Sequence, residues 1–174
     1  MKSTILKALS LSFLALLIIY LFISPKAELG GKQIWHIPTR LINYELDGRG
    51  TNKQVFDIYS FSHVTHGILF YYILKSLGLP STSIVYAATL LEVAWELFEN
   101  TPFIINKYRE KKEFKDFHGD SIVNMIGDII FTLLGVWLAY SSPKYAVIYV
   151  ISSEILLHHF GASLLHLSFG SLIN

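Results

Sequence analysis

Residues 129–139 read Ile-Ile-Phe-Thr-Leu-Leu-Gly-Val-Trp-Leu-Ala and contain no charged side chain. Two further stretches, Ile68–Leu74 and Ile84–Leu91, are also uncharged. A helix in a soluble bundle keeps one polar face toward water, whereas these stretches are apolar on nearly every face of a helix. We therefore predict helices that cross a membrane. A soluble helical bundle is the less favoured alternative.

The composition indicates one membrane-embedded domain. The chain has 174 residues, a length typical of one domain, and 52% of them are hydrophobic, with a mean hydropathy of +0.46. Soluble proteins are roughly 45–50% apolar even with glycine counted. The net charge is +1 and no dense basic stripe is present, so we do not expect nucleic acid as a partner. The absence of cysteine excludes disulfides and thiolate metal ligands.

Five apolar stretches each approach the roughly 20 residues that cross about 30 Å of hydrocarbon. They predict an all-α fold, a transmembrane helical bundle of about five helices, at residues 5–23, 58–79, 82–100, 121–141 and 144–160. The first follows a basic start and lacks a small-residue cleavage site, so we expect an uncleaved helix rather than a signal peptide. Segment 24–57 contains Gly and Pro and is predicted to be an extramembrane loop. Residues 1–174 thus form a single membrane domain.

Polar residues interrupt the last four helices near one end. Consecutive membrane helices alternate in direction, so the starts of the second and fourth and the ends of the third and fifth lie on the same side. Spacings of three or four residues place each set in the second to fourth helices on one face. The sets are His63 and His66; Glu92, Glu96 and Glu99; Asp120, Asn124 and Asp128; and, in the last helix, Glu154, His158 and His159.

Charged residues inside a bilayer favour a functional interpretation. Each costs at least roughly 2.5–3.5 kcal/mol near the centre of a helix. They persist where they face the bundle interior and are paired, metal-bound or hydrated, which predicts a functional polar cavity. Interpretations of these residues without a functional role remain open. Glu99, Asp120 and His63 could lie at the level of the lipid headgroups, and Asp128 could pair structurally with a histidine or with the N–H of Trp95.

Two histidines one turn apart beside convergent carboxylates form a candidate metal site. Imidazole and carboxylate ligands suit Zn, Fe or Mn. We predict His63, His66 and Glu96 as ligands of a divalent metal such as Zn, with Asp120 or Glu99 as an alternate ligand. No H-E-x-x-H motif is present, so the metalloprotease fingerprint is missing.

The same region could perform acid–base chemistry without a metal. Buried carboxylates near one another raise each other's pKa, which suits a general base at neutral pH. The candidate catalytic residues are Glu92, Glu99, Asp120, Asn124 and Asp128. A proton relay in a transporter would use similar residues, although five helices without an internal repeat give little sign of alternating access.

Several motifs resemble one known family. The segments 57–67, 92–105, 108–109 and 119–124, followed by Asp128, are similar to conserved segments of an uncharacterised family of small bacterial multi-pass inner-membrane proteins, a domain of unknown function. The resemblance covers about residues 55–140 and is specific in combination. More distantly, the layout of His, Glu and Asp-x-x-x-Asn on successive helices resembles VanZ-like membrane proteins. The family implies an inner-membrane location but no reaction, and the C-terminal pair His158-His159 departs from its pattern.

Three functions are compatible with these patterns. The leading hypothesis is an intramembrane enzyme that acts on a lipid or lipid-linked envelope substrate. The alternatives are a non-enzymatic membrane protein that binds such a ligand and a proton-coupled transporter. Membrane lipids and a lipid-linked small molecule are therefore the expected partners. The residues alone leave the reaction and the oligomeric state open.

Overall fold

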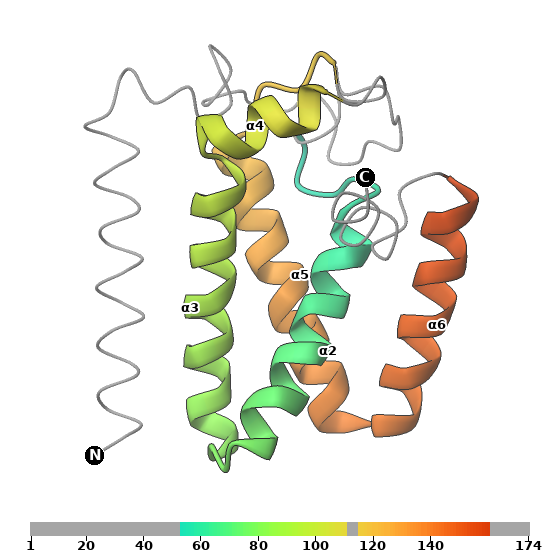
Figure 1. Cartoon of the computed structure of the whole chain (residues 1–174). Helices are drawn as coiled ribbons and strands as arrows, with labels where there is room; N and C mark the ends of the chain where they lie inside the picture. Colours follow the sequence, from blue (N-terminus) through green and yellow to red (C-terminus); the bar gives the residue numbers. More distant parts are fainter. Residues whose placement is uncertain (1–52, 111–114, 161–174) are drawn as a thin grey trace.

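The computed structural model describes residues 53–110 and 115–160, which form five helices and no β-strand. The helices are α2 (Ser60–Ser76), α3 (Ser81–Glu99), α4 (Pro102–Arg109), α5 (Ile122–Ser141) and α6 (Pro143–His159). The four long helices run up and down beside one another, and α4 lies across one end of the bundle (Figure 1). The predicted all-α fold is thereby confirmed. The predicted helix at 5–23 and almost all of the predicted loop at 24–57 lie outside the described residues.

Local sequence signals explain where the helices begin and end. Ser121 caps α5 because its Oγ accepts a hydrogen bond from the backbone N–H of Asn124, 3.2 Å away. Gly78 follows α2 with φ +79°, a conformation that glycine adopts without steric cost. Pro80 immediately precedes α3, and Pro143 is the first residue of α6, where a missing N–H costs nothing.

The helix α4 was not predicted. The predicted helices end at residue 100 and resume at residue 121, yet residues 102–109 form a helix. Thr101 Oγ1 accepts a hydrogen bond from the N–H of Ile104 at 3.4 Å, and Pro102 occupies the first turn. A capping Thr followed by Pro is a helix-start signal, so the segment between the third and fourth predicted spans is helical at its beginning.

Helices α2 and α5 make backbone contact at two glycines. A Cβ added to Gly67 would lie 1.9 Å from the carbonyl oxygen of Thr132, and one added to Gly135 would lie 2.0 Å from that of Val64. Thr132 Oγ1 also donates a hydrogen bond to the carbonyl of His63, at 3.0 Å. These close contacts hold the two helices at a fixed register.

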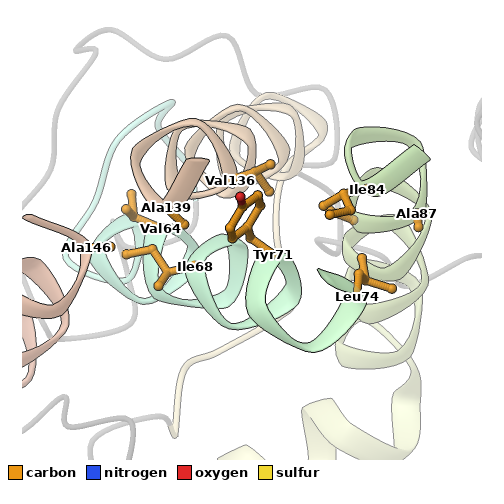
Figure 2. Packing of buried hydrophobic residues seen from close by; sticks show 10 residues of the cluster. Val64, Ile68, Tyr71, Leu74, Ile84, Ala87, Val136, Ala139 and Ala146 are labelled. Carbon is orange, nitrogen blue, oxygen red and sulfur yellow. The ribbon is translucent and has the colours of Figure 1, made fainter. Parts of the chain in front are cut away.

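The half of the bundle away from α4 is apolar, and we call it the apolar half. Its buried side chains come from α2, α3, α5 and α6 (Figure 2). They are Val64, Ile68, Tyr71, Leu74, Ile84, Ala87, Ala88, Val136, Ala139 and Ala146. Burial of these side chains packs the four helices together without any charged residue.

Large hydrophobic side chains are also exposed on the outer surface of the long helices. On α5 they recur every three or four residues, at Ile126, Ile130, Leu134 and Trp137. The opposite, buried face of the same helix carries Asn124, Asp128 and Thr132. Among the described residues, α5 is the one helix whose length of 20 residues and apolar composition suffice to cross a membrane. Helices α2 and α6 have 17 residues each and span about 26 Å at about 1.5 Å per residue.

Candidate functional site: a buried histidine–carboxylate cluster

Three helices bring four ionisable side chains together in the half of the bundle nearer α4. His63 comes from the first turn of α2, Glu92 and Glu96 from the second half of α3, and Asp128 from the second turn of α5. All four are buried, with 6%, 0%, 1% and 3% of their surfaces exposed. Together with His66 we call them the polar cluster. The predicted convergence of these residues agrees with the antiparallel directions of α2, α3 and α5.

His63 is the centre of the polar cluster. Its Nδ1 lies 2.5 Å from Glu92 Oε1, which is a short hydrogen bond, and 3.7 Å from Glu96 Oε1. Its Nε2 lies 3.8 Å from Asp128 Oδ1. One imidazole therefore faces three carboxylates from two other helices, and its two nitrogens point to different partners.

His66 connects the cluster with the surface. Its Nδ1 lies 3.6 Å from Glu92 Oε2, and its side chain is 16% exposed. Its ring stacks edge-on against the ring of Trp95, with centroids 5.6 Å apart. Trp95 is 38% exposed and Phe98, one turn further, is 50% exposed. The cluster thus approaches the outer surface between α2 and α3, at a place bordered by aromatic side chains.

The carboxylate of Glu96 is buried without a hydrogen bond. Neither of its oxygens has a hydrogen-bonding partner among the described residues, and the basic group beside it is His63 Nδ1, 3.7 Å from Oε1. In the parts of the chain that the structure describes, no Lys or Arg forms an ion pair with Glu92, Glu96 or Asp128. Burial of a charge is costly unless the charge is paired or neutralised. The cluster therefore needs protons or a bound cation for charge balance.

Two predicted site residues, Asp120 and Asn124, lie in hydrogen-bonded contacts next to the cluster rather than against His63. Asp120 and Asn100 bind each other twice: Asn100 Nδ2 donates to Asp120 Oδ2 at 2.6 Å, and Asn100 Oδ1 accepts from the N–H of Asp120 at 2.7 Å. Asn124 Nδ2 donates to the carbonyl of Gln54 and to Asp57 Oδ2. These contacts join the end of α3 and the chain before α2 to the start of α5.

Glu99 is bound by a tyrosine from α4. The hydroxyl of Tyr108 donates a hydrogen bond to Glu99 Oε1 at 2.9 Å. Burial and the Glu99 carboxylate raise the pKa of Tyr108 well above its ordinary value, so this hydroxyl keeps its proton. Glu99 therefore holds α4 against the end of α3.

Two residues beside the cluster were missed by the sequence analysis. Asp57 is fully buried, and its Oδ1 accepts hydrogen bonds from the N–H groups of Tyr59 and Ser60 at the start of α2. Ser60 Oγ lies 3.5 Å from Asp128 Oδ1. An Asp three residues before a Ser at a helix start is a capping pattern, and this signal could have identified Asp57. In contrast, His158 and His159 on α6 are exposed and outside the cluster.

The cluster offers two overlapping sets of metal ligands. The first is His63, His66 and Glu92, and the second is His63, Glu96 and Asp128; in each, one ligand atom from every residue lies within 4.8 Å of the others. The predicted ligands His63, His66 and Glu96 are divided between these sets, with His63 common to both. Nitrogen and carboxylate donors without sulfur fit Zn, Fe or Mn. The assignment of metal ligands and of catalytic residues stays a prediction.

Comparison with known proteins places the chain in a family. A family model described as "Protein of unknown function (DUF2585)" matches residues 31–168. The chain belongs to this family. It is 40% identical over 101 residues to a UPF0314 protein of Sinorhizobium fredii, a match that covers 56% of this chain and 51% of that protein. It is 32% identical over 140 residues to a UPF0314 protein of Paracoccus denitrificans, with 79% and 68% covered.

These relatives confirm the predicted membership of an uncharacterised bacterial family. The matched part of the chain spans about half the length of the Sinorhizobium fredii relative. No solved structure matches the chain. The likeness to VanZ-like proteins stays a prediction.

Proposed function

We propose that this chain is a multi-pass protein of the bacterial inner membrane and an enzyme that acts on a lipid or lipid-linked envelope substrate. The polar cluster is its active site in this proposal, with Glu92, Glu96 and Asp128 around His63. The main support for the proposal is the distribution of side chains in the bundle. Charged groups are buried inside it, and large apolar side chains are exposed on its outer surface. A soluble protein has the reverse distribution, because its charges are best solvated by water.

The outer faces support the membrane location. Exposed Ile, Leu, Val and aromatic residues occur on α2, α3, α5 and α6, and soluble monomers rarely expose apolar surface that is continuous over a large area. On α6 they include Val147, Ile148, Ile151 and Ile155. A membrane also explains why Asn124, Asp128 and Thr132 face inward on α5, since a polar group facing hydrocarbon would lose its hydrogen bonds.

The substrate class follows from the path to the cluster. His66 is the partly exposed member of the cluster, and its neighbours Trp95 and Phe98 are exposed aromatics on the outer surface. In a bilayer this surface contacts lipid. A substrate with an apolar chain can approach between α2 and α3 without leaving the membrane, and its polar group can then reach Glu92 and His63.

Lipid analysis of a deletion strain tests the enzyme. We expect at least one membrane lipid or lipid-linked species to change in the deletion and to recover with the wild-type gene. Glu92→Gln should fail to restore it at equal membrane abundance, whereas His158→Ala on the exposed part of α6 should restore it. An unchanged lipid profile in the deletion, or full recovery with Glu92→Gln, contradicts the proposal.

Alkaline extraction tests the membrane location separately. Carbonate at high pH removes peripheral proteins but leaves proteins that span the bilayer. We expect the full chain to remain in the membrane pellet after expression in bacteria. Release into the supernatant would contradict a multi-pass location.

A binding protein without turnover is the second candidate. The burial of the cluster favours it, since a ligand can be held at Glu92 and His63 without reacting. This candidate predicts that the purified protein retains a lipid-linked ligand unchanged, whereas the enzyme predicts conversion. Mass spectrometry of the lipids before and after incubation separates the two.

A further inference from the structure

We propose that His63, Glu96 and Asp128 bind one divalent metal cation, and that Glu92 orients His63 without binding the metal. The inference rests on the proposed function in that the cation is a cofactor of the same site. It goes further by assigning a separate role to each residue.

The hydrogen bond of Glu92 determines which nitrogen of His63 is available. Glu92 Oε1 lies 2.5 Å from Nδ1. We assign the hydrogen of this bond to Nδ1, which leaves the lone pair of the neutral ring on Nε2. Histidine ligands of metals commonly donate their second nitrogen to a carboxylate in this way. Nε2 faces Asp128 Oδ1 at 3.8 Å. Two donors that each lie about 2.1 Å from one ion are roughly 3.4 Å apart in a tetrahedral site.

The buried carboxylate of Glu96 also indicates a bound cation. Its side chain is 1% exposed, and neither carboxylate oxygen has a hydrogen-bonding partner among the described residues. One ligand atom each of His63, Glu96 and Asp128 lies within 4.8 Å of the others, and Glu96 Oε1 approaches the imidazole ring of His63 at Nδ1, 3.7 Å away. A buried carboxylate without a donor, placed beside a second carboxylate and an imidazole, fits the coordination of a cation.

The charges agree with a divalent ion. Glu96 and Asp128 contribute two negative charges when ionised, and the neutral His63 contributes none. In the parts of the chain that the structure describes, neither carboxylate has a Lys or Arg partner. Two carboxylates and one imidazole suit Mn²⁺, Fe²⁺ or Zn²⁺. Three protein ligands leave a position for water or substrate, as in catalytic zinc sites.

The other candidate set fits less well. It consists of His63, His66 and Glu92. Glu92 already uses Oε1 for the hydrogen bond to His63 and directs Oε2 toward His66 Nδ1, at 3.6 Å. A metal between these three residues would have to break the short bond between Glu92 and His63. The two sets share only His63, so substitution of His66 in the first set or of Asp128 in the second distinguishes them.

Metal titration of the full-length protein in detergent tests the assignment. The protein is stripped with a chelator and titrated with Co²⁺, whose visible absorption reports nitrogen and oxygen ligands, and Zn²⁺ content is measured after dialysis. We expect one ion per wild-type chain. Asp128→Asn and Glu96→Gln should weaken binding at least 100-fold, and Glu92→Gln by about 10- to 100-fold. His66→Ala and the exposed control His158→Ala should bind as the wild type does.

Each other outcome contradicts the inference. Less than a tenth of an equivalent of metal in the wild type overturns it, as does loss of metal with His66→Ala while Asp128→Asn retains it. Folding of each variant is checked by size exclusion, and a rise in the wild-type melting temperature with Zn²⁺ provides a readout without mutations. Lipid conversion distinguishes the failures: metal binding without conversion contradicts the proposed enzyme alone, and conversion in excess chelator contradicts the metal alone.

Discussion

The two halves of this bundle use the same helices for opposite purposes. In the apolar half, α2, α3 and α5 bury Ile68, Ile84 and Val136 against one another (Figure 2). In the half nearer α4, the same helices bury His63, Glu96 and Asp128. Packing of hydrocarbon stabilises the fold, whereas buried charges commonly stabilise it less than apolar side chains of similar volume. We infer that the apolar half maintains the fold and that the polar cluster is retained for function.

Substitution at the junction of the halves should have the largest effect. Gly67→Ala places a Cβ 1.9 Å from the carbonyl oxygen of Thr132, so α2 and α5 must separate. We expect a loss of about 3 kcal/mol in the free energy of unfolding, measured by thermal or denaturant unfolding in detergent. The control Gly78→Ala has open space around the new methyl but φ +79°, and should cost about 1 kcal/mol. Equal losses of unfolding free energy in Gly67→Ala and Gly78→Ala would contradict the close contact between α2 and α5 at Gly67.

A charge added beside the polar cluster should have the next largest effect. Asn100→Asp replaces the amide that donates to Asp120 Oδ2 with a second carboxylate. We expect a loss of about 2 kcal/mol at neutral pH, decreasing as the pH falls, since protonation of one carboxyl removes the repulsion. The exposed control Asn106→Asp on α4 should change stability little. A loss that is independent of pH would show that repulsion is not its cause.

Shortening one buried side chain in the apolar half should reduce stability without affecting the polar cluster. Ile84→Val removes one methylene from a side chain that is 1% exposed, which costs about 1 kcal/mol. Ile126→Val on the outer surface of α5 should cost almost nothing, because Ile126 is 53% exposed. Unfolding and metal titration of both variants check this, and metal affinity should equal that of the wild type. A weakened metal site in Ile84→Val would show that the halves are coupled.

Removal of one hydrogen bond between α2 and α5 should have the smallest effect. Thr132→Val deletes the hydroxyl that donates to the carbonyl of His63. In the proposed membrane location, hydrogen bonds between helices contribute about 0.6 kcal/mol on average, and we expect a loss of this size in unfolding measurements. Thr89→Val is the matched control, since the hydroxyl of Thr89 donates to the carbonyl of Val85 in its own helix. A loss no larger than that of Thr89→Val would show that this hydrogen bond does not stabilise the contact between α2 and α5.

Helix direction and residue spacing predicted the polar cluster well where the residues are inside regular helices. His63, Glu92, Glu96 and Asp128 obey these rules, and the structure brings them together. Asp120 does not follow the spacing rule. It precedes the capping residue of α5, so helical spacing cannot be extended to it. Its contact with Asn100 depends on the path of the chain between α4 and α5, which periodicity does not describe.

The other differences between the predictions and the structure concern residues outside the apolar stretches. The segment that forms α4 is too polar for a membrane span, and only Thr101 and Pro102 signalled its helix. Asp57 precedes α2 and was hidden in a segment assigned to a loop. Side-chain contacts such as the bond between Glu92 and His63 could not be predicted, because spacing gives the face of a helix but not its partner atoms.

The most direct test of the account is the melting temperature of Glu96→Leu compared with the wild type, both in excess chelator. Glu96 is buried and accepts no hydrogen bond among the described residues, so an apolar side chain of similar volume should be tolerated without loss. We predict a melting temperature equal to or above that of the wild type, together with failure to restore the lipid profile of the deletion strain. A fall of several degrees would contradict the claim that this charge is retained for function rather than for stability.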